Sequence, residues 1–243
     1  MRANKISHEE GVILGNMKPQ EVIDEIRIIV PSQIRKEHDF RVKYLKSLHA
    51  VLRSKPRVRH YQLKRSAVWM SLYSHINWLA HFKFLKTEKV DSYIPTWLAT
   101  TFGWPSETAE AFWYCGRNPI AHTGSQNLPY SKNIKGAKRY IQLSFDNPTD
   151  WSMQGAFMAL PESAAKRPAG TLPIQQTTFF YRPTEQLLEK LMDDVALSIS
   201  TLDHADLLKL QKVMMSFNFF KDDGSLARMN NLLDVYEHVK DQE

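Results

Sequence analysis

The sequence predicts a mainly α-helical protein, a helical bundle with a small β-hairpin or meander inserted around residues 137 to 182. Apolar residues recur every three to four positions through most of the chain, which is the period of an amphipathic helix. Residues 137 to 182 differ, because β-branched and aromatic runs alternate there with Pro and Gly. With 243 residues, of which 43% are hydrophobic, the chain can bury a core without a metal or a disulfide. We expect a single domain over residues 1 to 243.

Residues 1 to 56 are expected to contain a pair of helices. The first begins near Pro19 and should end at Pro31, since a proline inside a helix removes a hydrogen bond and clashes with the preceding turn. Ser32 is the expected N-cap of the second helix, which is strongly basic and ends at Pro56. The apolar positions expected to face inward are Val22, Ile23, Ile26, Ile29, Val30, Ile34, Leu45, Leu48 and Leu52.

A third helix is expected over residues 61 to 86. Its apolar residues lie nearly all round, which is typical of a helix at the centre of a bundle. His75 is therefore expected to be a packed core histidine. The remaining polar stripe either supports a functional site or, as is more common, is a solvent-facing or interhelical face. This stripe consists of Ser71, Ser74, Asn77 and His81.

Short elements follow the central helix. Helical pieces are expected around Trp97 and over residues 107 to 115, with Ser106 as the N-cap of the latter. Short strands are expected at residues 140 to 145 and 177 to 181. The aromatic residues of the first stretch could stack on bases, but their helical spacing favours core packing. They are Trp97, Phe102, Trp104, Phe112, Trp113 and Tyr114.

The C-terminal part returns to helix. Thr184 is the expected N-cap of a helix that continues past a kink near Thr201 to Met215. Ser225 is expected to cap a last helix with a regular apolar period.

Charge is unevenly distributed along the chain. Residues 35 to 65 hold 11 Lys and Arg against 2 acids, whereas residues 183 to 243 hold 12 acids and 6 bases. The formal net charge is +6. Such an asymmetry favours a polyanionic partner, although long helices also carry solvated basic faces without one.

Several classes of protein are excluded by what the sequence lacks. The single Cys115 cannot form an internal disulfide, and no zinc-ligand spacing accompanies it. The N-terminus has charges where a secretory signal needs an apolar run, and no stretch of 18 apolar residues follows, so we expect a cytoplasmic protein without a membrane segment. Glycine-rich phosphate loops and nucleophile elbows are also missing. We expect no metal and no cofactor.

One passage carries candidate chemistry, residues 112 to 124, which read F-W-Y-C-G-R-N-P-I-A-H-T-G. Arg117 and His122 lie five positions apart, which separates two side chains by about 140° on an ideal helix. Pro119 cannot donate a hydrogen bond to the Cys115 carbonyl, so we expect a kink, or a break with Asn118 as a new N-cap. Either geometry could present Arg117 and His122 to one cleft.

This passage resembles the signature of the HEPN superfamily, helical-bundle proteins of prokaryotic defence and toxin systems and of some eukaryotic RNA-processing enzymes. The family motif is an Arg, four to six residues, then a His, which Arg117 and His122 match. Asn118 matches the polar residue common directly after the Arg, and Gly124 resembles the small residue often found after the His. The resemblance implies a metal-independent endoribonuclease in a toxin or phage-defence setting.

The resemblance also implies a role for each motif residue. His122 would transfer protons and Arg117 would stabilise charge on the transferring phosphate, with Asn118 as a supporting or capping residue. Because one His does not readily serve as both base and acid, the family uses composite sites in dimers. This implies a homodimer here, and a cognate antitoxin or regulatory partner is a further expectation.

The basic helix is the expected path of the RNA backbone, with Lys43, Lys46 and Arg53 as candidate contacts. Two alternatives stay open. Arg117 and His122 could be a surface Arg and a packed His at a helix kink, and the whole chain could be a non-catalytic helical RNA-binding or regulatory module.

Overall fold

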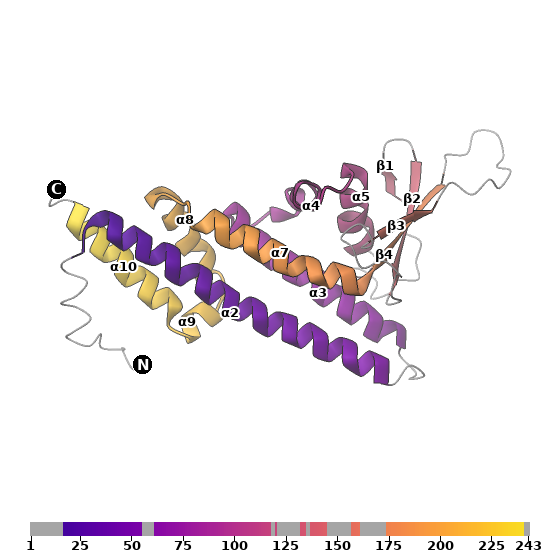
Figure 1. Cartoon of the computed structure of the whole chain (residues 1–243), viewed down its shortest axis with the longest axis horizontal. Coiled ribbons are helices and arrows are strands. Elements are labelled where there is room, and N and C mark those ends of the chain that lie inside the picture. Colours follow the sequence, from indigo (N-terminus) through magenta and orange to yellow (C-terminus); the bar gives the residue numbers. More distant parts are fainter. Residues whose placement is uncertain are drawn as a thin grey trace. The chain divides into compact units, whose positions relative to one another are not determined.

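The structure is a computed structural model that describes residues 17–54, 61–117, 120, 132–134, 137–144, 157–160 and 174–240. The described residues are mainly helical, with one small sheet (Figure 1). The predicted class, a helical bundle with a β insertion, is confirmed. None of the described helices combines the length and the apolar character needed to cross a membrane.

The chain divides into two compact units that are each discontinuous in sequence. The first unit consists of the described parts of Met1–Glu37, His81–Glu88 and Asp194–Glu243. The second unit consists of the described parts of His38–Ala80 and Lys89–Asp193.

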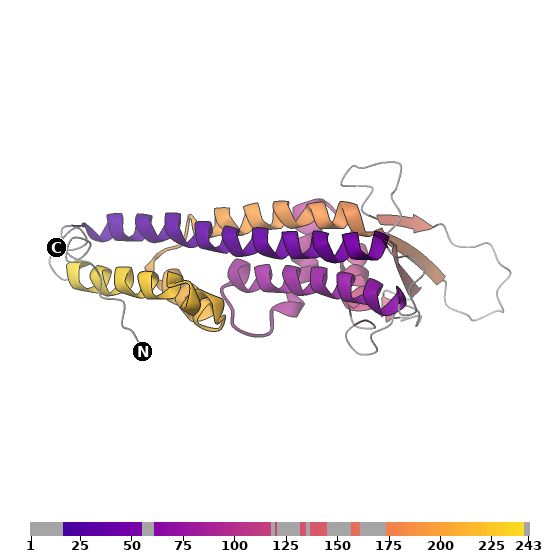
Figure 2. The same cartoon turned by 90° about the horizontal axis from the view of Figure 1, so that it is seen from below.

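Helix α2 (Pro19–Ser54) is a single uninterrupted helix, which corrects the expected pair (Figure 2). Pro31 lies inside it, so Ser32 caps no helix. A proline inside a helix costs about 3 kcal/mol. The helix continues because its apolar face does not stop at the proline, and full burial of one aliphatic side chain contributes about 1.5–3 kcal/mol. The buried residues on both sides of Pro31 are Val22, Ile23, Ile26, Val30 and Ile34.

Helix α3 (Tyr61–Phe84) is buried over most of its surface, as predicted for a central helix. Its largest fully buried side chains in the second unit are Trp69 and Tyr73. Ser74, in the predicted polar stripe, is exposed, whereas His75 is buried as expected. At the other end, in the first unit, Phe82 stacks on Phe217 with ring centroids 5.6 Å apart.

Four short helical segments follow α3 in the second unit. They are η1 (Val90–Ser92), α4 (Ile94–Phe102), α5 (Ser106–Glu110) and η2 (Ala111–Gly116). The helix expected over residues 107 to 115 is thus α-helical only to Glu110, and its second half is π-helical. Its N-cap is Pro105, one residue before the expected Ser106.

The aromatic residues of this stretch line the core rather than the surface. Trp97, Trp104, Phe112 and Trp113 are all buried. The interpretation of their helical spacing as core packing is therefore confirmed for these four.

The β insertion is a mixed four-stranded sheet, not a simple hairpin or meander. Its strands are β1 (Lys132–Ile134), β2 (Ala137–Ser144), β3 (Phe157–Leu160) and β4 (Ile174–Phe180), in the order β1-β2-β4-β3. The central pair, β2 and β4, is parallel, and the two outer pairs are antiparallel.

Burial explains the parallel central pair. Leu143 of β2 lies opposite Phe179 of β4, and both side chains are buried. Phe179 packs on Phe112 of η2, with ring centroids 4.9 Å apart. Pairing β2 with β4 therefore places two apolar side chains together against η2.

Four helices complete the chain: α7 (Tyr181–Ile199), α8 (His204–Met215), α9 (Phe219–Asp222) and α10 (Ser225–Lys240). α7 begins three residues before Thr184, whose hydroxyl donates to the Phe180 carbonyl at 2.6 Å instead of capping the helix. The kink expected near Thr201 is a complete break, and Asp203 caps α8 by accepting the Asp206 N–H at 2.8 Å. The last helix begins at Ser225, so this residue lies inside the helix instead of capping it, and its N–H donates to Asp223 Oδ1 at 2.8 Å.

Candidate functional site

Arg117 is the one described member of the candidate motif, and it directly follows the π-helical segment η2. Its backbone N–H donates to the Trp113 carbonyl, so Arg117 is still helical. π-helical turns inside α-helices occur frequently at functional sites. Asn118 and His122 lie outside the described residues, and so does the break or kink expected at Pro119.

The Arg117 guanidinium is held by two contacts within the second unit. Its Nη1 donates to Asp91 Oδ2 at 3.1 Å, and its Cζ lies 5.1 Å from the centre of the Trp113 ring. The Arg117 side chain is 27% exposed and that of Asp91 49% exposed. Such a partly exposed ion pair contributes about 0–1 kcal/mol, so a ligand with more negative charge could replace Asp91.

Asp91 also influences the neighbouring side chains. The Tyr114 hydroxyl donates to the Asp91 carbonyl at 3.5 Å, and burial, followed by the charge of Asp91, raises the pKa of Tyr114. The second carboxylate oxygen, Asp91 Oδ1, is buried and accepts no hydrogen bond from the described residues. This carboxylate can therefore accept one more donor close to Arg117.

The backbone at Gly116, which directly precedes Arg117, is tightly packed. The Tyr73 hydroxyl donates to the Phe112 carbonyl at 3.1 Å and occupies the space beside Gly116. A Cβ atom at Gly116 would lie 2.1 Å from that hydroxyl oxygen, so only glycine fits. Burial, and secondly the neighbouring Cys115, raises the pKa of Tyr73 well above its usual value.

The candidate RNA contacts lie in the half of α2 that belongs to the second unit. Lys43 and Lys46 are both exposed, and neither forms an ion pair with another described residue. Arg53 lies in the last turn of α2, and its side chain is outside the described part of the chain.

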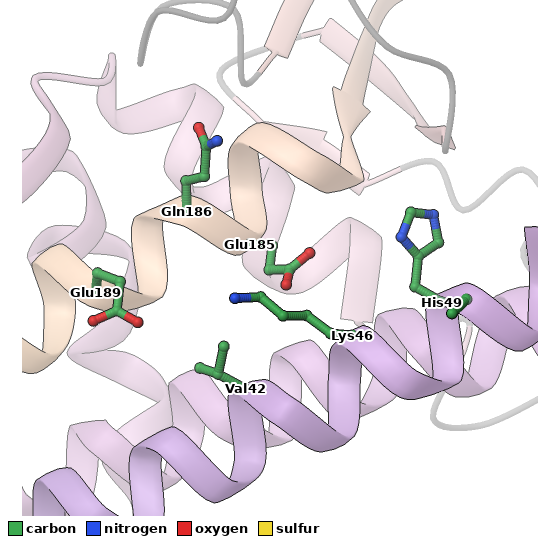
Figure 3. A pocket seen from close by; sticks show the side chains of 7 residues that line it. Val42, Lys46, His49, Glu185, Gln186 and Glu189 are labelled. Atoms are coloured by element: carbon green, nitrogen blue, oxygen red, sulfur yellow. The ribbon is translucent and has the colours of Figure 1, made fainter.

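Lys46 lines a pocket between α2 and α7 in the second unit, with a volume of about 420 Å³. Figure 3 shows its ammonium group extending from α2 toward Glu185 and Glu189 of α7. His49 lies on the α2 side and contacts the Tyr181 ring, with ring centroids 4.6 Å apart. The pocket therefore places cationic and anionic side chains opposite one another.

A second group of titratable side chains lies beside this pocket. His38 of α2 and His75 of α3 are both buried, and His75 Nε2 lies 3.1 Å from His38 Nδ1. The other nitrogen of His38, Nε2, lies 3.2 Å from Glu189 Oε1 on α7. Burial, followed by the charges of His38 and Arg41, lowers the pKa of His75 well below its usual value, so His75 is neutral near pH 7.

This second group was not predicted from the sequence, although one signal for it was present. His38 follows Ile34 and precedes Val42 by four residues each, so it occupies the apolar face of α2. A titratable residue on an apolar face needs a partner when it is buried. Its partners His75 and Glu189 are on other helices, and no spacing in the sequence connects them.

Comparisons with known proteins do not place the chain in a family: no family model, no curated protein and no solved structure matches it.

Proposed function

We propose that this chain is a metal-independent endoribonuclease of HEPN type, acting in a prokaryotic toxin or phage-defence setting. The proposal rests on the Arg117 to His122 motif, on the mainly helical fold, and on the basic half of α2. The observation that carries it is the position of Arg117. This side chain is oriented by an acid and an aromatic ring, yet it stays partly exposed.

Arg117 suits the stabilisation of negative charge during RNA cleavage. A guanidinium has five N–H donors, of which the Asp91 contact uses one, so a phosphate could be bound by others. The cation–π contact with Trp113 restricts the guanidinium group before the ligand arrives. An oriented cation of this kind stabilises a transition state without the cost of reorganising at the moment of reaction.

His122 is assigned the proton transfer, because histidine titrates near neutral pH. In this proposal it acts on the 2′-hydroxyl or on the departing 5′-oxygen of the RNA. A second copy of the chain supplies the complementary group in a homodimer, with Asn118 in support. Lys43, Lys46 and Arg53 contact the RNA backbone.

The test uses end-labelled RNA in buffer that contains EDTA. The parent chain should produce fragments with 2′,3′-cyclic phosphate ends, and His122→Ala should lower the rate by about 10²–10⁴-fold. Arg117→Ala should lower it comparably. Arg228→Ala is the matched control, because Arg228 is also in an exposed ion pair, with Glu25 at 3.3 Å, and should leave the rate unchanged.

Two results contradict the proposal. One is cleavage by the parent only when Mg²⁺ is added, and the other is cleavage by the Arg117 and His122 variants at the parent rate. If the parent binds RNA in a salt-dependent manner but never cleaves it, the chain is the alternative, a non-catalytic RNA-binding or regulatory module.

A further inference from the structure

We propose that His38, Asp39 and Glu189 form a binding site for a divalent transition-metal ion of the zinc class. The site lies in the second unit, where α2 supplies His38 and Asp39 and α7 supplies Glu189. It is independent of the proposed nuclease activity, which requires no metal.

The three donor atoms are close enough to share one ion. One ring nitrogen of His38 and one carboxylate oxygen each from Asp39 and Glu189 lie within 4.8 Å of one another. The closest measured pair, His38 Nε2 and Glu189 Oε1, is 3.2 Å apart. Zinc binds nitrogen and oxygen ligands at about 2.0–2.2 Å, which leaves ligand atoms about 3–4 Å apart. Because both carboxylates are exposed, they can rotate over the remaining fraction of an ångström.

His38 is held in the way that metal-binding histidines usually are. A ligating imidazole uses one nitrogen for the metal, and its other nitrogen is hydrogen-bonded to a neighbour that fixes the ring orientation. His75 is that neighbour, with its Nε2 at 3.1 Å from His38 Nδ1. Since both rings are buried, this orientation is built into the core of the second unit.

The charges of the site favour a cation over a proton alone. A proton between His38 Nε2 and Glu189 Oε1 would satisfy those two atoms and leave Asp39 unused, whereas a divalent ion uses both carboxylates. Of the neighbouring cations, Arg41 lies over the Trp78 ring at 4.6 Å, and Lys46 extends toward Glu185 and Glu189 in the pocket (Figure 3).

The pocket between α2 and α7 provides access. Glu189 lines both the pocket and the candidate site, so an ion can enter from solvent. Three protein ligands leave coordination positions for water, as in zinc sites that are not purely structural. The imidazole ligand favours zinc, copper, iron or nickel over calcium and magnesium, which prefer sites made only of oxygen.

The experiment is a calorimetric titration of the full chain, stripped with EDTA and desalted, with Zn²⁺. A parallel titration with Co²⁺ follows the visible absorption that reports the ligands of that ion. Glu189→Gln and Asp39→Asn keep the shapes of two exposed side chains, so both variants should fold. Each should weaken Zn²⁺ binding at least about tenfold, since even the loss of a residue that only hydrogen-bonds to a metal ligand lowers metal affinity 10–100-fold.

Glu185→Gln is the matched control. Glu185 lies one turn before Glu189 on α7 and lines the same pocket, but it is not one of the three donors. The control should bind Zn²⁺ like the parent. The proposal is overturned if the parent shows no saturable binding at micromolar Zn²⁺, or if Glu185→Gln weakens binding as much as Glu189→Gln. Cleavage of RNA in EDTA, measured on the same variants, is expected to be unchanged, so failure of either proposal can be recognised separately.

Discussion

Arg117 and His38 are held in contrasting ways within the second unit. Arg117 is partly exposed, and its two partners, Asp91 and Trp113, precede it by 26 and four residues. His38 is fully buried, and its partners His75 and Glu189 come from two other helices.

This difference separates two kinds of site. The Arg117 side chain can exchange Asp91 for a ligand without disturbing the core. The His38 ring cannot move without breaking the contacts between α2, α3 and α7, so any ligand there must be recruited by the exposed carboxylates. Four predictions test how sharply the two regions differ.

The largest effect is expected at Gly116, which directly precedes Arg117. Gly116 is buried in the core, whereas the Arg117 side chain is partly exposed. Gly116→Ala should destabilise the fold by about 3 kcal/mol, because the new methyl group overlaps the Tyr73 hydroxyl. Urea unfolding measures the change. In an ordinary helix the same substitution stabilises by about 0.5–1 kcal/mol, so the sign alone is diagnostic.

Tyr73→Phe provides the control for this prediction. Removing the hydroxyl oxygen leaves the ring carbon as the nearest atom, at 3.1 Å from the new methyl group. The double variant should therefore be less destabilised than the sum of the two single variants. Simple additivity would contradict the packing described here.

The second effect concerns the buried histidines. His75→Leu should destabilise the fold by about 2 kcal/mol, because it leaves His38 Nδ1 buried without its hydrogen-bond partner. The neighbouring exposed Ser74→Ala on the same helix should change the stability by less than about 0.5 kcal/mol. Equal effects of the two substitutions in thermal unfolding would remove the contrast between the buried group and the surface.

The third effect is a pH dependence on the alkaline side. Burial raises the pKa of Tyr73, so the unfolded chain loses this proton near pH 10 while the folded chain retains it. Stability contributed by neutral Tyr73 is thus complete below pH 10 and falls above it, by up to about 1.4 kcal/mol per pH unit. Tyr73→Phe should show a correspondingly smaller loss between pH 10 and 11 in urea unfolding.

The smallest effect is expected for the ion pair at Arg117. Arg117→Ala and Asp91→Ala should each change the stability by less than about 1 kcal/mol, with a coupling energy of about 0.5 kcal/mol that decreases with salt. A double-mutant cycle at low and high ionic strength measures this coupling. A coupling of several kcal/mol would show that Arg117 is a structural residue.

The fold could be predicted from the sequence wherever local pattern and burial agree. The central helix α3 is an example, because apolar residues on all sides admit few other interpretations. Pro31 shows where a local rule fails: the cost of one proline is smaller than the gain from a continuous buried face. The order of the strands could not be predicted from the sequence either, because the pairing of β2 with β4 depends on Phe112, which is distant in sequence from both strands.

The two regions around Arg117 and His38 differ in how much of each is visible in the sequence. Arg117 was a candidate from the sequence because its motif is a short stretch of residues. The contact with Asp91 was not, since it depends on where η1 lies after the turn that follows α3. The group around His38 has no local signature, and only the presence of a histidine on an apolar helix face pointed toward it.

The π-helical segment η2 determines the direction in which Arg117 points. A π-turn holds one residue more than an α-turn, so it absorbs a single inserted residue within one turn. If residues 111 to 116 were wound as a regular α-helix, every later side chain would be rotated by about 100° about the helix axis. Arg117 would then point away from Asp91. A one-residue change in helical register here would therefore change the direction of the Arg117 guanidinium.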